Sequence, residues 1–77
     1  MDLRVLRYFV KTVEAGSISA AAVDCHVAQP SITLAIAKLE EEFSCKLFER
    51  HRKGCSATEE GMKMYSMAKD VLYHAQS

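Results

Sequence analysis

One stretch of sequence decides the fold of this chain: Ser17-Ile-Ser-Ala-Ala-Ala-Val-Asp-Cys-His-Val-Ala-Gln-Pro-Ser-Ile-Thr-Leu-Ala-Ile-Ala-Lys-Leu-Glu-Glu41. It predicts two short helices joined by a tight turn. Ser17 is placed to cap the first helix, residues 18–25, whose run of alanines lets another helix approach closely. The second helix opens with Gln29-Pro30, because proline is tolerated in a first turn, where amides have no intrahelical partner.

The second of these helices, residues 29–43, has two unlike faces. Steps of about 100° per residue put Ile32, Ile36, Leu39 and Phe43 on one line, which we expect to be buried. The opposite face and its flanks carry mostly small, uncharged or hydrogen-bonding groups: Pro30, Ser31, Thr33, Leu34, Ala37, Lys38 and Glu41. A helix of this kind after a tight turn indicates a helix-turn-helix, whose exposed helix enters the DNA major groove.

The flanking sequence predicts a small body around this pair. An earlier helix is expected to end at Gly16, and its apolar residues follow helical spacing: Leu3, Leu6, Phe9, Val10 and Val13. Residues 46–50 and 55–57 could form two short strands, with His51-Arg52-Lys53-Gly54 as the turn. Thr58 is placed to cap a long final helix that reaches about Ala75.

A basic hairpin directly after a helix-turn-helix is a wing. The expected fold class is therefore mainly α, a winged helix-turn-helix: a three-helix body with a small two-stranded β wing and a long C-terminal linker helix. With 77 residues, the chain can form only one small domain.

The charge balance is unusual for a DNA-binding chain. Ten basic and ten acidic residues cancel, although affinity for duplex DNA comes largely from neutralised phosphates. Cations gather between residues 46 and 53, whereas residues 40–42 are three consecutive glutamates. If the two groups lie on different faces, the molecule is dipolar rather than basic.

Compartment and metal content follow from what the sequence lacks. No apolar run approaches the roughly 20 residues of a membrane span, and the N-terminus has no signal-peptide pattern. Three widely spaced cysteines, Cys25, Cys45 and Cys55, suit a reducing compartment. We therefore expect a cytoplasmic protein without a membrane partner. His26 and His51 invite a zinc interpretation, but no Cys-x-x-Cys pair accompanies them, so no metal and no cofactor are expected.

The final helix carries more apolar surface than one core needs. Its apolar arc spans about 160°, whereas a stripe that faces a single core needs about 100°. We expect the excess to pack against a second copy of the chain, with a broad core face as the alternative. The expected homodimer contacts are Met64, Tyr65, Met67, Ala68, Val71, Leu72 and Ala75.

Several short motifs follow one another in a characteristic order. They are Leu6-Arg7-Tyr8-Phe9, Gly16-Ser17-Ile18-Ser19 with Ala21-Ala22, Gln29-Pro30-Ser31-Ile32-Thr33, Ile36, Leu39-Glu40, Leu47-Phe48-Glu49-Arg50 and Thr58-x-x-Gly61. Each is weak alone, but their spacing is specific. Over nearly its whole length the chain resembles the N-terminal DNA-binding domain of LysR-type transcriptional regulators.

This resemblance implies a winged helix-turn-helix over residues 1–58 and a linker and dimerisation helix over residues 59–77. In that family an effector-binding domain follows the linker, and residues 1–77 contain none. A small-molecule effector is therefore expected only through that missing C-terminal domain, and the chain is either an excised fragment or a natural truncation.

Four positions depart from the family pattern. Cys25 and Ser44 stand where the family often has leucine and glycine, and the serine suggests a different helix end. Leu34-Ala35 stands where many members carry Arg-Gln or similar polar residues. A leucine cannot hydrogen-bond a guanine edge, although it can contact thymine methyl groups.

The expected function is sequence-specific binding of double-stranded DNA for transcriptional regulation. The helix at 29–43 would enter the major groove and the wing at 50–55 would reach the minor groove. The candidate DNA contacts are Ser17, Ser19, Gln29, Pro30, Ser31, Thr33, Leu34, Lys38, Arg50, Arg52 and Lys53. Gln29 can pair with adenine, and Lys38 can take a phosphate.

Three other functions compete with this one. A protein-interaction or dimerisation module without DNA binding would fit the zero net charge and Leu34. A thiol redox sensor would need a lowered thiol pKa at Cys45 or Cys55, near the basic segment. An enzyme is not expected, because no motif places a base beside a nucleophile.

Overall fold

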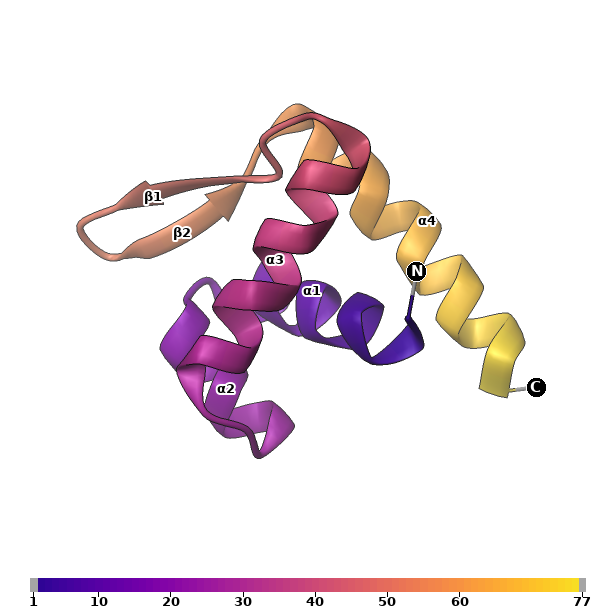
Figure 1. Cartoon of the computed structure of the whole chain (residues 1–77), viewed down its shortest axis with the longest axis horizontal. Helices are drawn as coiled ribbons and strands as arrows, with labels where there is room; N and C mark the ends of the chain where they lie inside the picture. The colour runs from indigo at the N-terminus through magenta and orange to yellow at the C-terminus, as the bar shows by residue number, and fades with distance from the viewer. Residues whose placement is uncertain (1, 77) are drawn as a thin grey trace.

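The structure, a computed structural model, describes residues 2–76, which form four helices and one small sheet (Figure 1). The elements in chain order are α1 (Leu3–Ala15), α2 (Ile18–Cys25), α3 (Gln29–Phe43), β1 (Phe48–His51), β2 (Gly54–Ala57) and α4 (Glu59–Gln76). The two strands are antiparallel. The predicted winged helix-turn-helix fold class is confirmed.

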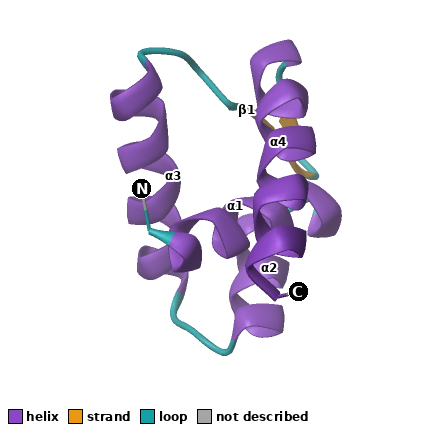
Figure 2. Ribbon diagram, turned by 90° about the vertical axis from the view of Figure 1, so that its right-hand side faces the viewer, coloured by secondary structure: helices purple, strands orange, loops and turns teal. Residues whose placement is uncertain are grey.

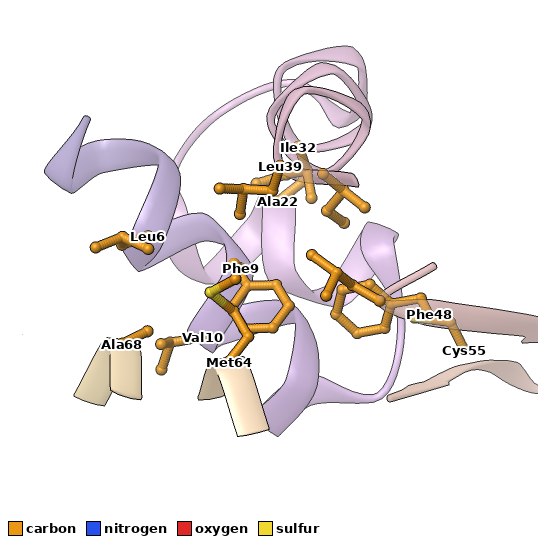
Figure 3. Close-up of a cluster of buried hydrophobic side chains, with 12 residues drawn as sticks. Leu6, Phe9, Val10, Ala22, Ile32, Leu39, Phe48, Cys55, Met64 and Ala68 are labelled. Carbon is orange, nitrogen blue, oxygen red and sulfur yellow. The ribbon is translucent and has the colours of Figure 1, made fainter. Parts of the chain in front are cut away.

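Helix α1 lies at the centre of the body. It packs against α2, α3 and α4, and Figure 2 shows α3 and α4 on opposite sides of it. Phe9 of α1 is completely buried, and its ring meets that of Phe48 edge-on, with 5.4 Å between the ring centroids. Figure 3 shows side chains from α1, α3, the sheet and α4 converging on this centre.

The helix ends follow local rules of sequence. The carboxylate of Asp2 accepts the N–H of Arg4 at 2.8 Å, and this hydrogen bond lowers the pKa of Asp2. Gly16 ends α1 in the left-handed conformation, as predicted. The predicted caps are also present: the Ser17 hydroxyl accepts the N–H of Ala20, and the Thr58 hydroxyl accepts the N–H of Gly61.

Helix α3 ends at Ser44, which adopts the left-handed conformation with φ 53°. The expectation of a different helix end is therefore wrong, because serine here takes the conformation that glycine adopts without strain. The line of expected core residues on α3 is also corrected at two positions. Phe43 is exposed and Ala35 is buried. The buried stripe thus follows the spacing of Ile32, Ala35, Ile36 and Leu39.

The two strands differ from the predicted ones by a shift along the chain. β1 begins at Phe48 rather than residue 46, and the loop is reduced to Arg52-Lys53, because His51 pairs with Gly54. Lys46 and Leu47 are excluded from the hairpin. Their backbone groups bond instead to side chains outside it, the N–H of Leu47 to Glu40 and the carbonyl of Lys46 to Thr58.

The hairpin is attached to the body by a close approach of two glycines. The N–H of Cys55 donates to the carbonyl oxygen of Gly16 at 2.9 Å, so β2 bonds to the turn between α1 and α2. Gly54 has φ 144°, and a Cβ atom there would collide with the same Gly16 oxygen. Only glycine fits at this contact, which fixes the wing against the start of α2.

Replacing Gly54 by alanine should therefore destabilise the chain by about 1–3 kcal/mol and loosen the wing, because the new Cβ adds a collision to an unfavourable φ. Urea unfolding followed by circular dichroism measures the effect. Gly16→Ala is the matched control: its φ is also positive at 74°, but nothing lies within 4 Å of the added Cβ. Equal losses in the two variants would contradict the role of the contact.

Candidate nucleic-acid interface

The outward face of α3 is exposed along its N-terminal part, as the sequence predicted. Its buried stripe packs toward α1, which turns the remaining side chains to solvent. The exposed candidates on this helix are Gln29, Pro30, Ser31, Thr33, Leu34 and Lys38. Leu34 is 62% exposed. Lys38 follows it one turn later, and both side chains line the same groove.

The N-terminal end of α3 is open to a partner. Its N-cap residue, Ala28, offers no side-chain acceptor, but its carbonyl oxygen accepts the N–H of Ser31 at 3.0 Å. Gln29 and Pro30 occupy this end. Pro30 has no N–H, so this end presents the exposed Gln29 side chain, at the position where a helix in the major groove places its base-reading residues.

The wing extends away from the helices (Figure 1) and carries its cations on its outer part. Arg50, Arg52 and Lys53 are exposed, and the last two form the loop. Among residues 2–76, the ion pairs are Arg4–Asp2 and Lys63–Glu59, so the wing cations have no acidic partner within the described chain. They are available to phosphates.

The wing and α3 enclose a groove. Its lining comes from Ile36 and Glu40 of α3, from Phe48 to Arg50 of β1, and from Ile18 at the start of α2. Ser17 lies beside Gly54, the first residue of β2 after the wing loop. Its hydroxyl caps α2, 3.5 Å from the exposed hydroxyl of Ser19. Of the predicted contacts, Arg50 lines this groove, Ser17 and Ser19 stand beside the wing, and Ser31, Leu34 and Lys38 line a separate groove.

Glu40 is a positioning residue that the sequence analysis did not single out. One of its carboxylate oxygens accepts the N–H of Leu47 at 2.9 Å and that of Phe48 at 3.4 Å, which anchors β1 to α3. Its place four residues after Ile36, on the flank of the buried stripe, was the available signal. Glu41 and Glu42, in contrast, are exposed.

The basic and acidic residues that cancel in the net charge are concentrated in different elements. The wing tip carries cations, whereas acidic residues occupy the C-terminal end of α3 at 40–42 and the first turn of α4 at Glu59 and Glu60. The two groups lie on different elements. Glu40 and Arg50 nevertheless line one groove, so the dipolar arrangement stays a prediction.

The thiols do not support the redox-sensor hypothesis. Burial raises the pKa of the Cys55 thiol, although the nearby Arg50 guanidinium opposes the shift. Burial also raises the pKa of Cys25. Within residues 2–76, no three His, Cys, Asp or Glu side chains gather in a way that could hold a metal ion. No helix in that range is long and apolar enough to span a bilayer.

The wide apolar arc of α4 divides into two parts. Met64 and Ala68 are buried against the chain's own core, which corrects their assignment as partner contacts. Tyr65 and Leu72 are half-buried on the same core, and the Tyr65 hydroxyl donates to Glu14 at 2.8 Å. The exposed remainder is Met67, at 46%, and Val71, at 40%, with Ala75 following.

Comparisons with known proteins agree with this geometry. Residues 3–62 match the family described as bacterial regulatory helix-turn-helix protein, lysR family. The chain is 42% identical over 72 residues to the nitrogen assimilation regulatory protein nac of Klebsiella aerogenes, covering 94% of this chain and 24% of that protein. It is 40% identical over 73 residues to the HTH-type transcriptional regulator ClcR of Pseudomonas putida, covering 95% and 25% respectively. The chain thus spans about a quarter of the length of these curated relatives.

Solved structures show the same fold. The crystal structure of the CbnR_DBD–DNA complex matches with a TM-score of 0.95 and 37% identity, over 99% of this chain and 87% of that one. The crystal structure of the BenM_DBD/catB site 1 DNA complex matches with a TM-score of 0.93 and 39% identity, over 99% and 84%. Both neighbours were solved together with DNA.

Glu40→Ala should destabilise the chain by about 1–3 kcal/mol, because two backbone N–H groups lose their acceptor. Amide hydrogen exchange at Leu47 should speed up in the same variant, and urea unfolding gives the free energy. Glu40→Gln retains one acceptor oxygen and should lose less. The neighbouring exposed Glu41→Ala serves as control, and a loss as large as that of Glu40→Ala would argue against the anchor.

Proposed function

Because the chain belongs to the lysR family of bacterial regulatory helix-turn-helix proteins, we propose that it binds double-stranded DNA sequence-specifically and serves transcriptional regulation. One observation carries this conclusion. The exposed, nearly uncharged face of α3 lies beside a wing whose cations have no acidic partner within residues 2–76. A reading helix needs the first feature, and a phosphate-binding element needs the second.

Helix α3 reads bases in the major groove. The amide of Gln29 offers a donor and an acceptor, which pair bidentately with adenine. Leu34, which is 62% exposed, has no hydrogen-bonding group and can make only an apolar contact with a thymine methyl. Ser31 and Thr33 reach bases or phosphates from the flanks of the same face. The half-site is therefore rich in A·T pairs.

The wing and the start of α2 contact the DNA backbone. Arg52 and Lys53 form the two-residue loop and border or enter the minor groove, while Arg50 stands one residue before the end of β1. Ser17 lies beside Gly54 of the wing, and Ser17 and Ser19 reach phosphates from the N-terminal end of α2. These contacts fix the register of α3 on the duplex.

A second copy of the chain packs on α4. The exposed strip of Met67, Val71 and Ala75 is the part of the helix that the chain's own core leaves uncovered. Methionine and valine there can adapt to an apolar partner surface. Two copies related by two-fold symmetry would meet two half-sites, so the operator is an interrupted palindrome. An effector acts only through a further domain beyond these residues.

Two other points follow from DNA as the partner. The place of action is the bacterial cytoplasm, where the chromosome lies. We assign no catalytic role, in keeping with relatives named as regulators. The alternative of a protein-interaction module without DNA binding rests on the zero net charge and on the exposed Leu34. A steep fall of DNA affinity with salt would exclude it.

Selection of bound duplexes from a random pool tests the reading helix. The wild-type chain should return an interrupted palindrome with A·T-rich half-sites. Gln29→Ala should cost roughly 1–3 kcal/mol and relax the preference at one position. Leu34→Arg should shift the preference toward guanine at its contact. The same sequence preference in all three proteins would show that α3 does not read bases.

Sedimentation equilibrium tests the second copy. The wild-type chain should be dimeric at high micromolar concentration, and Val71→Asp should make it monomeric, because a carboxylate would be buried without a partner. Ser66→Asp adds the same charge on a different side of α4 and should leave the dimer intact. A monomeric wild-type chain at that concentration would rule out the α4 dimer for residues 1–77.

A further inference from the structure

Helix α3 has a second flank, on the side away from the wing. There a groove is lined by the cap residue Asp2, by Arg4 and Tyr8 of α1, and by Ser31, Leu34 and Lys38 of α3. Figure 1 shows the wing on the left of α3 and the N-terminal end of α1 on its right. Arg4 therefore stands beside the same helix face that the wing approaches from the other side.

Arg4 is an accessible cation, and its ion pair with Asp2 is weak. Its side chain is 74% exposed, and its guanidinium lies 3.4 Å from the carboxylate of Asp2, which is itself exposed. Exposed ion pairs contribute little because water screens both charges. Asp2 is fixed by its second role as the cap of α1. The carboxylate thus keeps the guanidinium near the groove without burying it.

A helix in the major groove lies between two phosphate backbones, about 12 Å apart across the groove. The wing cations serve one of them. On α3 itself the single basic residue is Lys38, and it lies on the flank that faces Arg4. Without Arg4, that second backbone would meet only one positive charge from the groove beside α3.

We propose that Arg4 and Lys38 form a clamp on the phosphates of the DNA backbone opposite the wing. The planar guanidinium of Arg4 exchanges the Asp2 carboxylate for a phosphate, whose oxygens it can bind with two N–H groups. This inference rests on the proposed function. It adds to that function a DNA contact from α1, outside the helix-turn-helix and the wing.

The placement favours phosphate over base. Arg4 belongs to α1 and approaches α3 from its flank, whereas base edges meet the outward face at the N-terminal end of α3. Lys38 stands two turns beyond Ser31, well away from that end. Backbone contacts of this kind fix the position of a reading helix and are independent of sequence.

The test compares two arginines on one helix. Arg7 is also exposed, but it lines a different groove, with Asp24 of α2 and Leu72 of α4. Arg4→Gln and Arg7→Gln remove the same charge from the full 77-residue chain. The affinity of each variant is measured against salt on the selected duplex and on an unrelated duplex of equal length. Thermal melts by circular dichroism establish that both variants fold.

Arg4→Gln should lower the slope of log affinity against log salt by about 0.9 on both duplexes, and Arg7→Gln should leave it unchanged. Between 50 and 200 mM salt this corresponds to about a 3.5-fold smaller loss of affinity in the Arg4 variant. Asp2→Asn keeps an N-cap acceptor but removes the competing charge. It should therefore bind both duplexes more tightly than the wild-type chain.

Two results would overturn the clamp: equal slopes for the Arg4 and Arg7 variants, or a changed base preference of Arg4→Gln with an unchanged slope, which would indicate base reading. Arg52→Gln separates this failure from that of the proposed function. If Arg52→Gln lowers the salt slope and Arg4→Gln leaves it unchanged, the clamp is wrong but the proposed function stands. A wild-type chain without salt-dependent DNA binding defeats the proposed function itself.

Discussion

Burial of α1 is the constraint on which the rest of this structure depends. The helix packs against α2, α3 and α4, and Phe9 at its centre has no exposed surface. Complete burial of such a side chain contributes roughly 1.5–3 kcal/mol, a large share of the 5–15 kcal/mol typical of a domain's whole stability. Because α3 and α4 lie on opposite sides of α1, the proposed DNA face and the proposed dimer face belong to opposite sides of the body.

The position of the wing is set by its contacts with the helices of the body. An isolated two-stranded hairpin is marginally stable in water, so its orientation has to be imposed from outside. Three attachments do this: the Cys55 N–H on the Gly16 carbonyl, the Glu40 carboxylate on the amides that lead into β1, and the Thr58 hydroxyl on the Lys46 carbonyl. Each bond joins the hairpin or its approach to a different helix or helix end. The cations at the wing tip are therefore held at a defined place relative to α3.

This arrangement explains how a chain without net charge can serve a polyanion. Affinity for phosphates depends on the charges at the contact, not on their total. The acidic residues at the end of α3 and the start of α4 lie on other elements than the wing loop, and one of them, Glu40, anchors β1. Overall neutrality thus coexists with exposed cations on either side of α3, on the wing and at Arg4 and Lys38.

The sequence by itself determined the helices, their ends and the exposed face of α3. Caps such as Gly16, Ser17 and Thr58 act through hydrogen bonds within four residues, so their pattern is legible along the chain. Only the tertiary structure decided how the apolar arc of α4 divides, with Met64 buried and Met67 exposed, and why Gly54 must be glycine. It also decided that Arg4 stands beside α3. These features depend on which segment, distant in sequence, packs against each residue. Helical periodicity predicts the direction in which a side chain points but not the residue that it contacts.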